Sequence, residues 1–159
     1  MRTFQAVSLI FLITLACSSK RFFNTSYMKI GQGIAGKVIW LEGNLMPQII
    51  EEGDTTKSLN RGKPVERYIC IYELTHRDQT VQEGGFYKEV NTRLVKKILS
   101  DQEGNFATPL DTGQYSLFVE ESQGLFANRF DGDGYIYPVE VEKGKITQVT
   151  LKIDYKAAY

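Results

Sequence analysis

The sequence has few of the residues that most often carry catalysis or bind metals. It contains one histidine and two cysteines in 159 residues. A Ser-His-Asp or Cys-His mechanism would have to use His76, which lies in the polar stretch Thr75-His76-Arg77-Asp78 without a nucleophile motif beside it. A zinc site needs several His or Cys ligands, more than this chain supplies. We therefore expect no catalytic residue and no cofactor, and a hydrolase is the least favoured alternative.

The chain also lacks an excess of charge of either sign. Lys and Arg total 19, Asp and Glu total 19, and 42% of the residues are hydrophobic. That hydrophobic content is too high for a disordered polyelectrolyte. Without a basic surplus there are few counterions to release from a nucleic acid, so we expect no nucleic-acid partner. The length favours one domain.

The sequence has no apolar run long enough to span a membrane, and its one extended apolar run lies near the N-terminus. Residues 6–16 read AVSLIFLITLA after a basic start, which is too short for the roughly 20 apolar residues of a membrane span but typical of a secretory signal peptide. The junction Ala16-Cys17-Ser18-Ser19 resembles a bacterial lipobox, although Thr14 takes the usual leucine position and Leu15 follows one place late. The prediction is a lipoprotein signal peptide over 1–16, a lipid on Cys17 that binds the membrane, and a tether over 17–29.

The second cysteine fits this interpretation. Cys70 lies in the apolar run Tyr68-Ile69-Cys70-Ile71-Tyr72, where we expect it to be a small buried hydrophobe. Two alternatives remain for the N-terminal region. One is an ordinary signal peptide with an incidental cysteine, and the other is a Cys17–Cys70 disulfide, which acylation of Cys17 would prevent.

The rest of the chain, 30–159, reads as a single all-β domain. Short runs rich in Val, Ile, Tyr and Phe alternate with glycine-containing turns, and no segment after the signal peptide has helical periodicity. The expected strands are 33–41, 65–74, 94–99, 106–108, 114–120, 125–130, 135–141 and 146–153. Seven or eight strands of this size predict an immunoglobulin-like or transthyretin-like sandwich, with 65–74 as a central strand.

One segment interrupts this rhythm of strands. Residues 44–61 form an inserted loop that is longer than the connections usual in compact domains. It contains a small apolar cluster that includes Met46 and Pro47. We consider these two residues candidates for binding a partner.

Aromatic and acidic side chains supply the other candidate sites. The candidate residues for an aromatic stacking platform are Trp40, Phe86, Tyr87, Phe126, Phe130, Tyr135 and Tyr137. Phe86 and Tyr87 follow Gly84-Gly85, so we expect them to lie exposed in a loop. Asp131 and Asp133, in Asp131-Gly132-Asp133-Gly134, are weak candidates for a calcium site. A plain Asp-Gly turn also explains that motif, because the further oxygen ligands of an EF-hand are missing.

Several stretches together resemble the carboxypeptidase regulatory-like domain. They are Gly33-Ile34-Ala35-Gly36-Lys37-Val38, Gly62-Lys63-Pro64-Val65, Ser100-Asp101-Gln102-Glu103-Gly104-Asn105-Phe106 and Leu110-Asp111-Thr112-Gly113-Gln114-Tyr115-Ser116-Leu117. In this pattern Gly104 takes the positive φ of a hairpin turn, while Phe106, Tyr115 and Leu117 point into the core. The inserted loop departs from the family pattern. The segments 40–47 and 153–159 also resemble a group of small Bacteroidota lipoproteins.

The resemblance implies a prealbumin-like sandwich that serves as a non-catalytic accessory, spacer or adhesion module. The zinc ligands of carboxypeptidases belong to a different domain and do not carry over. The resulting hypothesis is a lipid-anchored binding or structural module of the cell envelope, whose partner is an envelope protein or a glycan. The alternative is a carbohydrate- or peptide-binding accessory that uses exposed aromatics. Ser18-Ser19-Lys20-Arg21 lacks the acidic residues associated with surface export, which favours an outer-membrane lipoprotein facing the periplasm.

Overall fold

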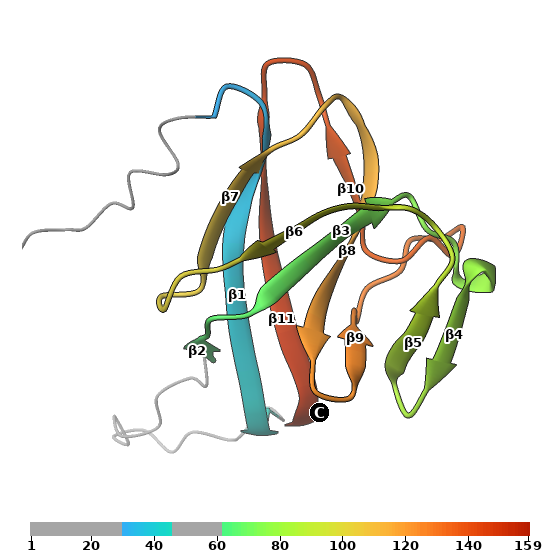
Figure 1. The fold of residues 1–159 in the computed structure, drawn as a ribbon. Coiled ribbons are helices and arrows are strands. Elements are labelled where there is room, and N and C mark those ends of the chain that lie inside the picture. Colours follow the sequence, from blue (N-terminus) through green and yellow to red (C-terminus); the bar gives the residue numbers. More distant parts are fainter. Residues whose placement is uncertain (1–29, 46–61) are drawn as a thin grey trace, which may run out of the picture.

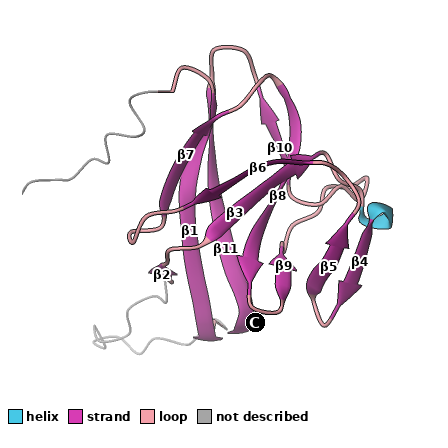
Figure 2. Ribbon diagram, viewed as in Figure 1, coloured by secondary structure: helices cyan, strands magenta, loops and turns pink. Residues whose placement is uncertain are grey.

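The structure, a computed structural model, describes residues 30–45 and 62–159. The expected signal peptide and tether, the predicted lipidation site Cys17, and the candidates Met46 and Pro47 lie outside these ranges. The described chain forms eleven strands and one short 3-10 turn, η2 (Arg77–Gln79), as Figure 2 shows. Within these ranges, no helix has the length and apolar character that a bilayer span requires.

The first sheet is built around β1 (Gly33–Asn44). This strand pairs in parallel with β11 (Ile146–Ala158), beginning at Gly33 opposite Ile146. On its other side it pairs antiparallel with β7 (Asn105–Pro109) and, further along, with β2 (Lys63–Pro64). Ile34 and Val38 of β1 are fully buried, because alternate residues of a strand face the same side of the sheet.

The second sheet holds the remaining seven strands, with β3 (Tyr68–Glu73) between β6 (Leu94–Leu99) and β8 (Gly113–Glu121). This position confirms the predicted central strand. Beyond β8 the order continues through β9 (Gly124–Phe126) and β5 (Phe86–Val90) to β4 (Thr80–Glu83), and β10 (Pro138–Val141) also pairs with β8. Figure 1 shows this sheet lying across the first one, with the β4–β5 hairpin at its far end.

The two open sheets enclose one apolar core, which confirms the expected all-β sandwich. The core includes Ile69, Ile71 and Leu117 from the second sheet and Leu151 and Ile153 from β11. The structure has more strands than the seven or eight expected. The additional ones are the two-residue β2 and the β4–β5 hairpin, neither of which shows the apolar alternation that marks the others.

Several expectations about single residues are confirmed. Tyr115, Leu117 and Phe106 are buried, and so is Cys70. Gly104 has φ +75°, and a Cβ at that position would overlap the Val38 carbonyl oxygen. Only glycine therefore fits at this turn without a shift of the backbone.

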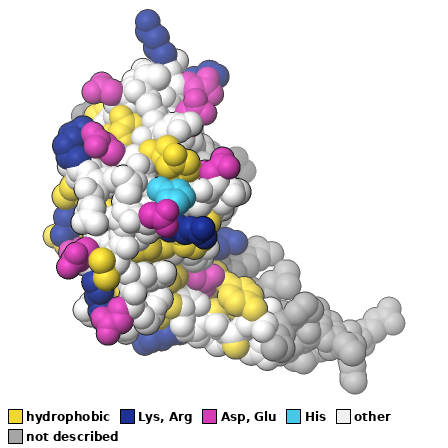
Figure 3. Space-filling model, turned by 90° about the vertical axis from the view of Figure 1, so that its right-hand side faces the viewer, with side chains coloured by type: hydrophobic (Ala, Val, Ile, Leu, Met, Phe, Trp, Pro, Cys, Tyr) yellow, Lys and Arg dark blue, Asp and Glu magenta, His cyan; other side chains and the backbone are white. Residues whose placement is uncertain are grey.

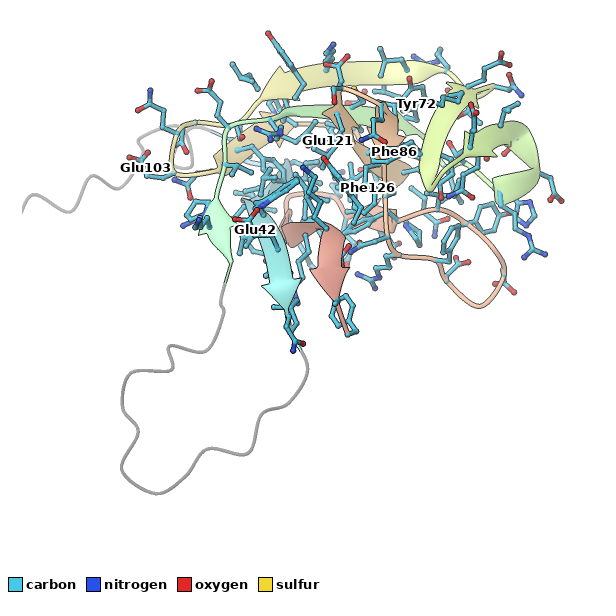
Figure 4. All side chains as sticks on the ribbon, turned by 90° about the horizontal axis from the view of Figure 1, so that it is seen from below. Glu42, Tyr72, Phe86, Glu103, Glu121 and Phe126 are labelled. Carbon is cyan, nitrogen blue, oxygen red and sulfur yellow. The ribbon has the colours of Figure 1, made fainter. Side chains whose placement is uncertain are left out.

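A partly buried ion pair closes one end of the sandwich. Arg67 Nε lies 2.7 Å from Glu121 Oε1, and the Glu121 side chain is only 6% exposed. The Tyr155 hydroxyl donates to the other Glu121 oxygen at 2.9 Å. Phe86 and Phe126 pack on the Tyr155 ring at centroid distances of 4.8 and 5.3 Å. Figure 4 shows Glu121, Phe86 and Phe126 at this end.

The expectation that Phe86 and Tyr87 are exposed in a loop is wrong. Both belong to β5, and both are almost completely buried. The glycines before them, Gly84 and Gly85, form the tight turn of the β4–β5 hairpin. The aromatic pair therefore begins a strand and does not lie in a loop. Phe86 faces the end of the core described above, and Tyr87 packs on Phe118 instead.

Candidate functional site

A hollow of about 410 Å³ lies between the β4–β5 hairpin and the turn that follows Phe130. Its lining residues are Arg77, Thr80, Gln82, Tyr87, Phe130, Asp131, Gly132, Asp133 and Gly134. The structure thus brings together four residues that the sequence singles out, namely Tyr87, Phe130, Asp131 and Asp133. Ligand sites are typically concave and combine an apolar wall with a few polar groups, and this hollow has that composition.

The hairpin supplies one wall of the hollow. Thr80 and Gln82 are alternate residues of β4, and Gln82 lies directly opposite Tyr87 of β5. The pairing shifts register between Val81 and Gln82. Such an irregularity re-aims the side chains of an edge strand, and here Gln82 and Tyr87 line the same hollow.

The opposite wall is a tight turn stabilised by Asp131. One carboxylate oxygen of Asp131 accepts hydrogen bonds from the backbone N–H groups of Asp133, at 3.0 Å, and Tyr135, at 2.8 Å. This geometry is the Asp-Gly turn that the sequence suggests, because an aspartate commonly bonds the backbone two residues on. Across the two described ranges, no group of three or more His, Cys, Asp or Glu side chains is placed to hold a metal ion.

His76 joins the two walls. Its Nδ1 accepts from the Asp78 backbone N–H at 3.3 Å, which assigns the proton to Nε2, and Nε2 donates to the Asp133 carbonyl oxygen at 2.9 Å. A Cβ on Gly134 would lie 2.7 Å from Nε2, so a glycine is required where the turn approaches the ring. Nδ1 also lies 3.3 Å from an Asp78 carboxylate oxygen, so both ring nitrogens are engaged and the imidazole links the segment before β4 to the turn.

The outer rim of the hollow is polar and mixed in charge. Figure 3 looks onto this side of the molecule and shows the single histidine with acidic and basic side chains next to it. Arg77 and Asp133 are exposed, and Phe130 is 48% exposed. Phe130 therefore offers an accessible ring beside groups that can donate and accept hydrogen bonds, which suits a ligand with both an apolar face and hydroxyl groups.

The inner part of the hollow contains an unusual tyrosine. Tyr87 is 2% exposed, and burial raises the pKa of its phenol to about 12. Its ring packs edge-on against Phe118 with the centroids 5.1 Å apart. Among the described residues, its hydroxyl is the one buried side-chain polar atom without a hydrogen-bond partner.

A second hollow, of about 590 Å³, lies near the start of the described chain. Two of its polar side chains are already bonded within the protein. Gln32 Nε2 donates to the Leu110 carbonyl oxygen at 2.9 Å, and the Tyr115 hydroxyl donates to the Asp111 carbonyl oxygen at 2.9 Å. Tyr115, the aromatic residue in its lining, is buried, whereas Phe130 offers an exposed ring, so the hollow beside Phe130 is the better candidate for binding a ligand.

Sequence reasoning misses Arg77, Thr80 and Gln82. The strand that contains Thr80 and Gln82 is mostly exposed, so it has no apolar alternation to reveal it. Arg77 reaches the hollow because its N–H donates to the Gly134 carbonyl oxygen at 3.1 Å, a contact across more than 50 residues that no local pattern encodes.

Comparisons with known proteins identify no relative of this chain. No family model, no curated protein and no solved structure matches it.

Proposed function

We propose that this chain is a lipid-anchored, non-catalytic module of the bacterial cell envelope that binds a carbohydrate in the hollow beside Phe130. The observation that carries the proposal is a half-exposed aromatic ring next to a concave surface lined by carboxylate, guanidinium and amide groups. Sugars present apolar C–H faces that stack on rings and hydroxyls that bond such groups.

A binding role is favoured over catalysis by the state of the two most reactive side chains. His76 Nε2 donates to the Asp133 carbonyl oxygen of the turn, while Nδ1 caps the η2 segment by accepting from the Asp78 N–H. Burial raises the pKa of the Cys70 thiol to about 11, so the nucleophilic thiolate is scarce at neutral pH. The thiol is therefore not prepared for nucleophilic attack, and the two ring nitrogens of His76 already serve the local fold.

The location belongs to the same proposal. The apolar run at 6–16 and the Ala16-Cys17 junction support export and lipid anchoring, and the lack of acidic residues directly after Cys17 favours the periplasmic face of the outer membrane. The motifs around Gly104 and Tyr115 support a relationship to carboxypeptidase regulatory-like domains, which are non-catalytic.

The test is a glycan array followed by calorimetry on the purified full chain and its Phe130→Ala variant. We expect the unaltered chain to retain one or a few oligosaccharides. Removal of the ring should weaken their binding about tenfold, because an aromatic contact contributes up to about 1.5 kcal/mol. Tests at Phe86 are unsuitable, since truncating a buried aromatic would destabilise the core.

Tyr68→Ala is the matched control. Tyr68 is an aromatic with 46% exposure, close to the 48% of Phe130, but it lies on β3 with Lys97 Nζ 4.6 Å from its ring centroid. We expect this variant to bind the same sugars as the unaltered chain. A chain that retains no glycan, or equal losses in the two variants, would refute carbohydrate binding at this hollow, and retention of peptides alone would point to a peptide ligand.

A further inference from the structure

The Tyr87 hydroxyl differs from those of three other tyrosines that pack in or against the core. The hydroxyls of Tyr115, Tyr137 and Tyr155 donate to Asp111 O, Thr150 O and Glu121 Oε2, respectively. Tyr87 is more deeply buried than these three, and its hydroxyl has no partner among the described residues. Nearly all buried polar groups in proteins are hydrogen-bonded, because an unpaired one costs folding free energy.

Phenylalanine would serve the fold at this position at least as well as tyrosine. The ring of Tyr87 already has its packing partner in Phe118, at an interplanar angle of 77°. The hydroxyl adds nothing to this edge-on contact and has lost its hydration. A polar group that the fold does not need, in a wall of a hollow, is explained by a task performed when the hollow is filled.

The surroundings of Tyr87 would let a ligand reach this group. The ring is held by Phe118, while Gln82, its partner across the β4–β5 pair, is an exposed side chain on an edge strand. Arg77 and Asp133 at the rim are exposed as well. A ligand that displaces these exposed side chains would meet a hydroxyl whose position is already set.

We propose that the Tyr87 hydroxyl is the specificity-determining hydrogen-bond partner of one ligand hydroxyl in the hollow beside Phe130. This inference rests on the proposed function and goes beyond it. Phe130 stacks on any sugar with an accessible apolar face, whereas Tyr87 selects those with a free hydroxyl at the inner end. A buried polar group left unpaired is the usual reason why a site rejects an analogue that lacks one hydroxyl.

The experiment compares the unaltered full chain with Tyr87→Phe, using the tightest oligosaccharide from the array and the complete set of its monodeoxy analogues. We expect Tyr87→Phe to bind the parent sugar about tenfold more weakly. One of the monodeoxy analogues should bind the unaltered chain about tenfold more weakly than the parent sugar does. Tyr87→Phe should bind the parent sugar and that analogue equally, since the interaction is already absent.

The stability of the free protein supplies an independent readout. Tyr87→Phe should melt at the same temperature as the unaltered chain or at a higher one, because it removes an unpaired hydroxyl. The control Tyr115→Phe removes a hydroxyl that is bonded to Asp111. That variant should melt at a lower temperature and bind the sugar normally.

The outcomes separate this inference from the proposed function. Unchanged sugar binding by Tyr87→Phe, together with loss in Phe130→Ala, would overturn the role of Tyr87 and leave carbohydrate binding intact. A lower melting temperature for Tyr87→Phe would show that the hydroxyl stabilises the fold, which also overturns the inference. If the unaltered chain binds no sugar, both proposals fail together.

Discussion

Cys70 and Tyr87 have their acid–base properties set by burial. Removal from solvent raises the pKa of the Cys70 thiol from 9.0 to about 11, while nearby Lys97 lowers it and Glu120 raises it. Burial alone raises the pKa of Tyr87 from 10.0 to about 12. In both cases the neutral form is favoured in the folded protein, because desolvation penalises the charge.

These shifts predict that the protein loses stability at alkaline pH in two stages. A group whose folded pKa is raised contributes stability below its unfolded pKa and loses it as pH rises through the folded value. The Cys70 contribution should therefore fall from pH 9 to about 11, and those of Tyr87 and Tyr155, whose pKa is also raised to about 12, from pH 10 to about 12. Urea unfolding at a series of pH values should show a decline that begins near pH 9, at no more than about 1.4 kcal/mol per pH unit for each proton.

The Cys70→Ala variant isolates the thiol in this series. Without Cys70, the decline should begin near pH 10, at the lower limit of the tyrosine window. Its stability at pH 7 will differ from that of the unaltered chain because a buried side chain is truncated, so the comparison concerns the shape of the pH profile. An identical onset in both proteins would contradict the assignment of the first stage to Cys70.

At the level of strands, hydrophobic alternation predicts the sandwich well wherever a strand packs on the core. The β6 bounds agree with the expected 94–99, and β3 is central as predicted. The β4 strand escapes detection because most of its side chains are exposed and its partner β5 is apolar mainly at its start. Misassignment of the hairpin is also why Phe86 and Tyr87 were expected in a loop.

The candidate site is harder to derive, because its two walls are separated in sequence. The hairpin wall and the Asp131 turn are brought together by His76 and by Ile136, whose N–H donates to the Thr75 carbonyl oxygen at 2.9 Å. Local motifs predict the shape of the turn and mark its residues. They do not encode which distant strand the turn faces.

We expect the strands to fold without the inserted loop. Trp40 and Lys63 are paired across β1 and β2, and β1 extends to Asn44, held there by Ala158 of β11. The gap from Leu45 to Gly62 is therefore roughly 15 Å, given about 3.4 Å per strand residue, and six extended residues reach about 20 Å. Replacing residues 46–61 with six Gly and Ser residues should leave a cooperatively folded domain, stabilised by about 1 kcal/mol through the shorter loop.

Thermal unfolding and glycan binding are the two measurements on this variant. Binding should persist, because the hollow beside Phe130 is lined by 77–87 and 130–134. In the control, residues 46–61 keep their number but their order is scrambled. This control separates the effect of shortening the loop from the effect of changing its sequence. Loss of cooperative unfolding would show that the loop contributes to the core, and loss of binding alone would assign Met46 and Pro47 a role in the site.

For the whole molecule, the arrangement of the described chain matters for how a tethered module would present its hollow. Figure 1 shows the start of the described chain on the opposite side of the sandwich from the β4–β5 hairpin. The first sheet and the core lie between that start and the hollow. A tether attached near residue 30 would therefore leave the hollow unobstructed by the point of attachment.

Membrane attachment through Cys17 is the last prediction, and the chain contains its own control. Cys17→Ala should remove incorporation of a labelled fatty acid and move the protein from the membrane pellet to the soluble fraction, because several acyl chains are needed for stable anchoring. Cys70→Ala should remain labelled and in the pellet, since Cys70 is buried in the folded domain. Measuring the label separates acylation from retention by an uncleaved apolar segment at 6–16. Label that persists in Cys17→Ala would contradict lipidation at Cys17, and label lost in Cys70→Ala would reassign the acyl group.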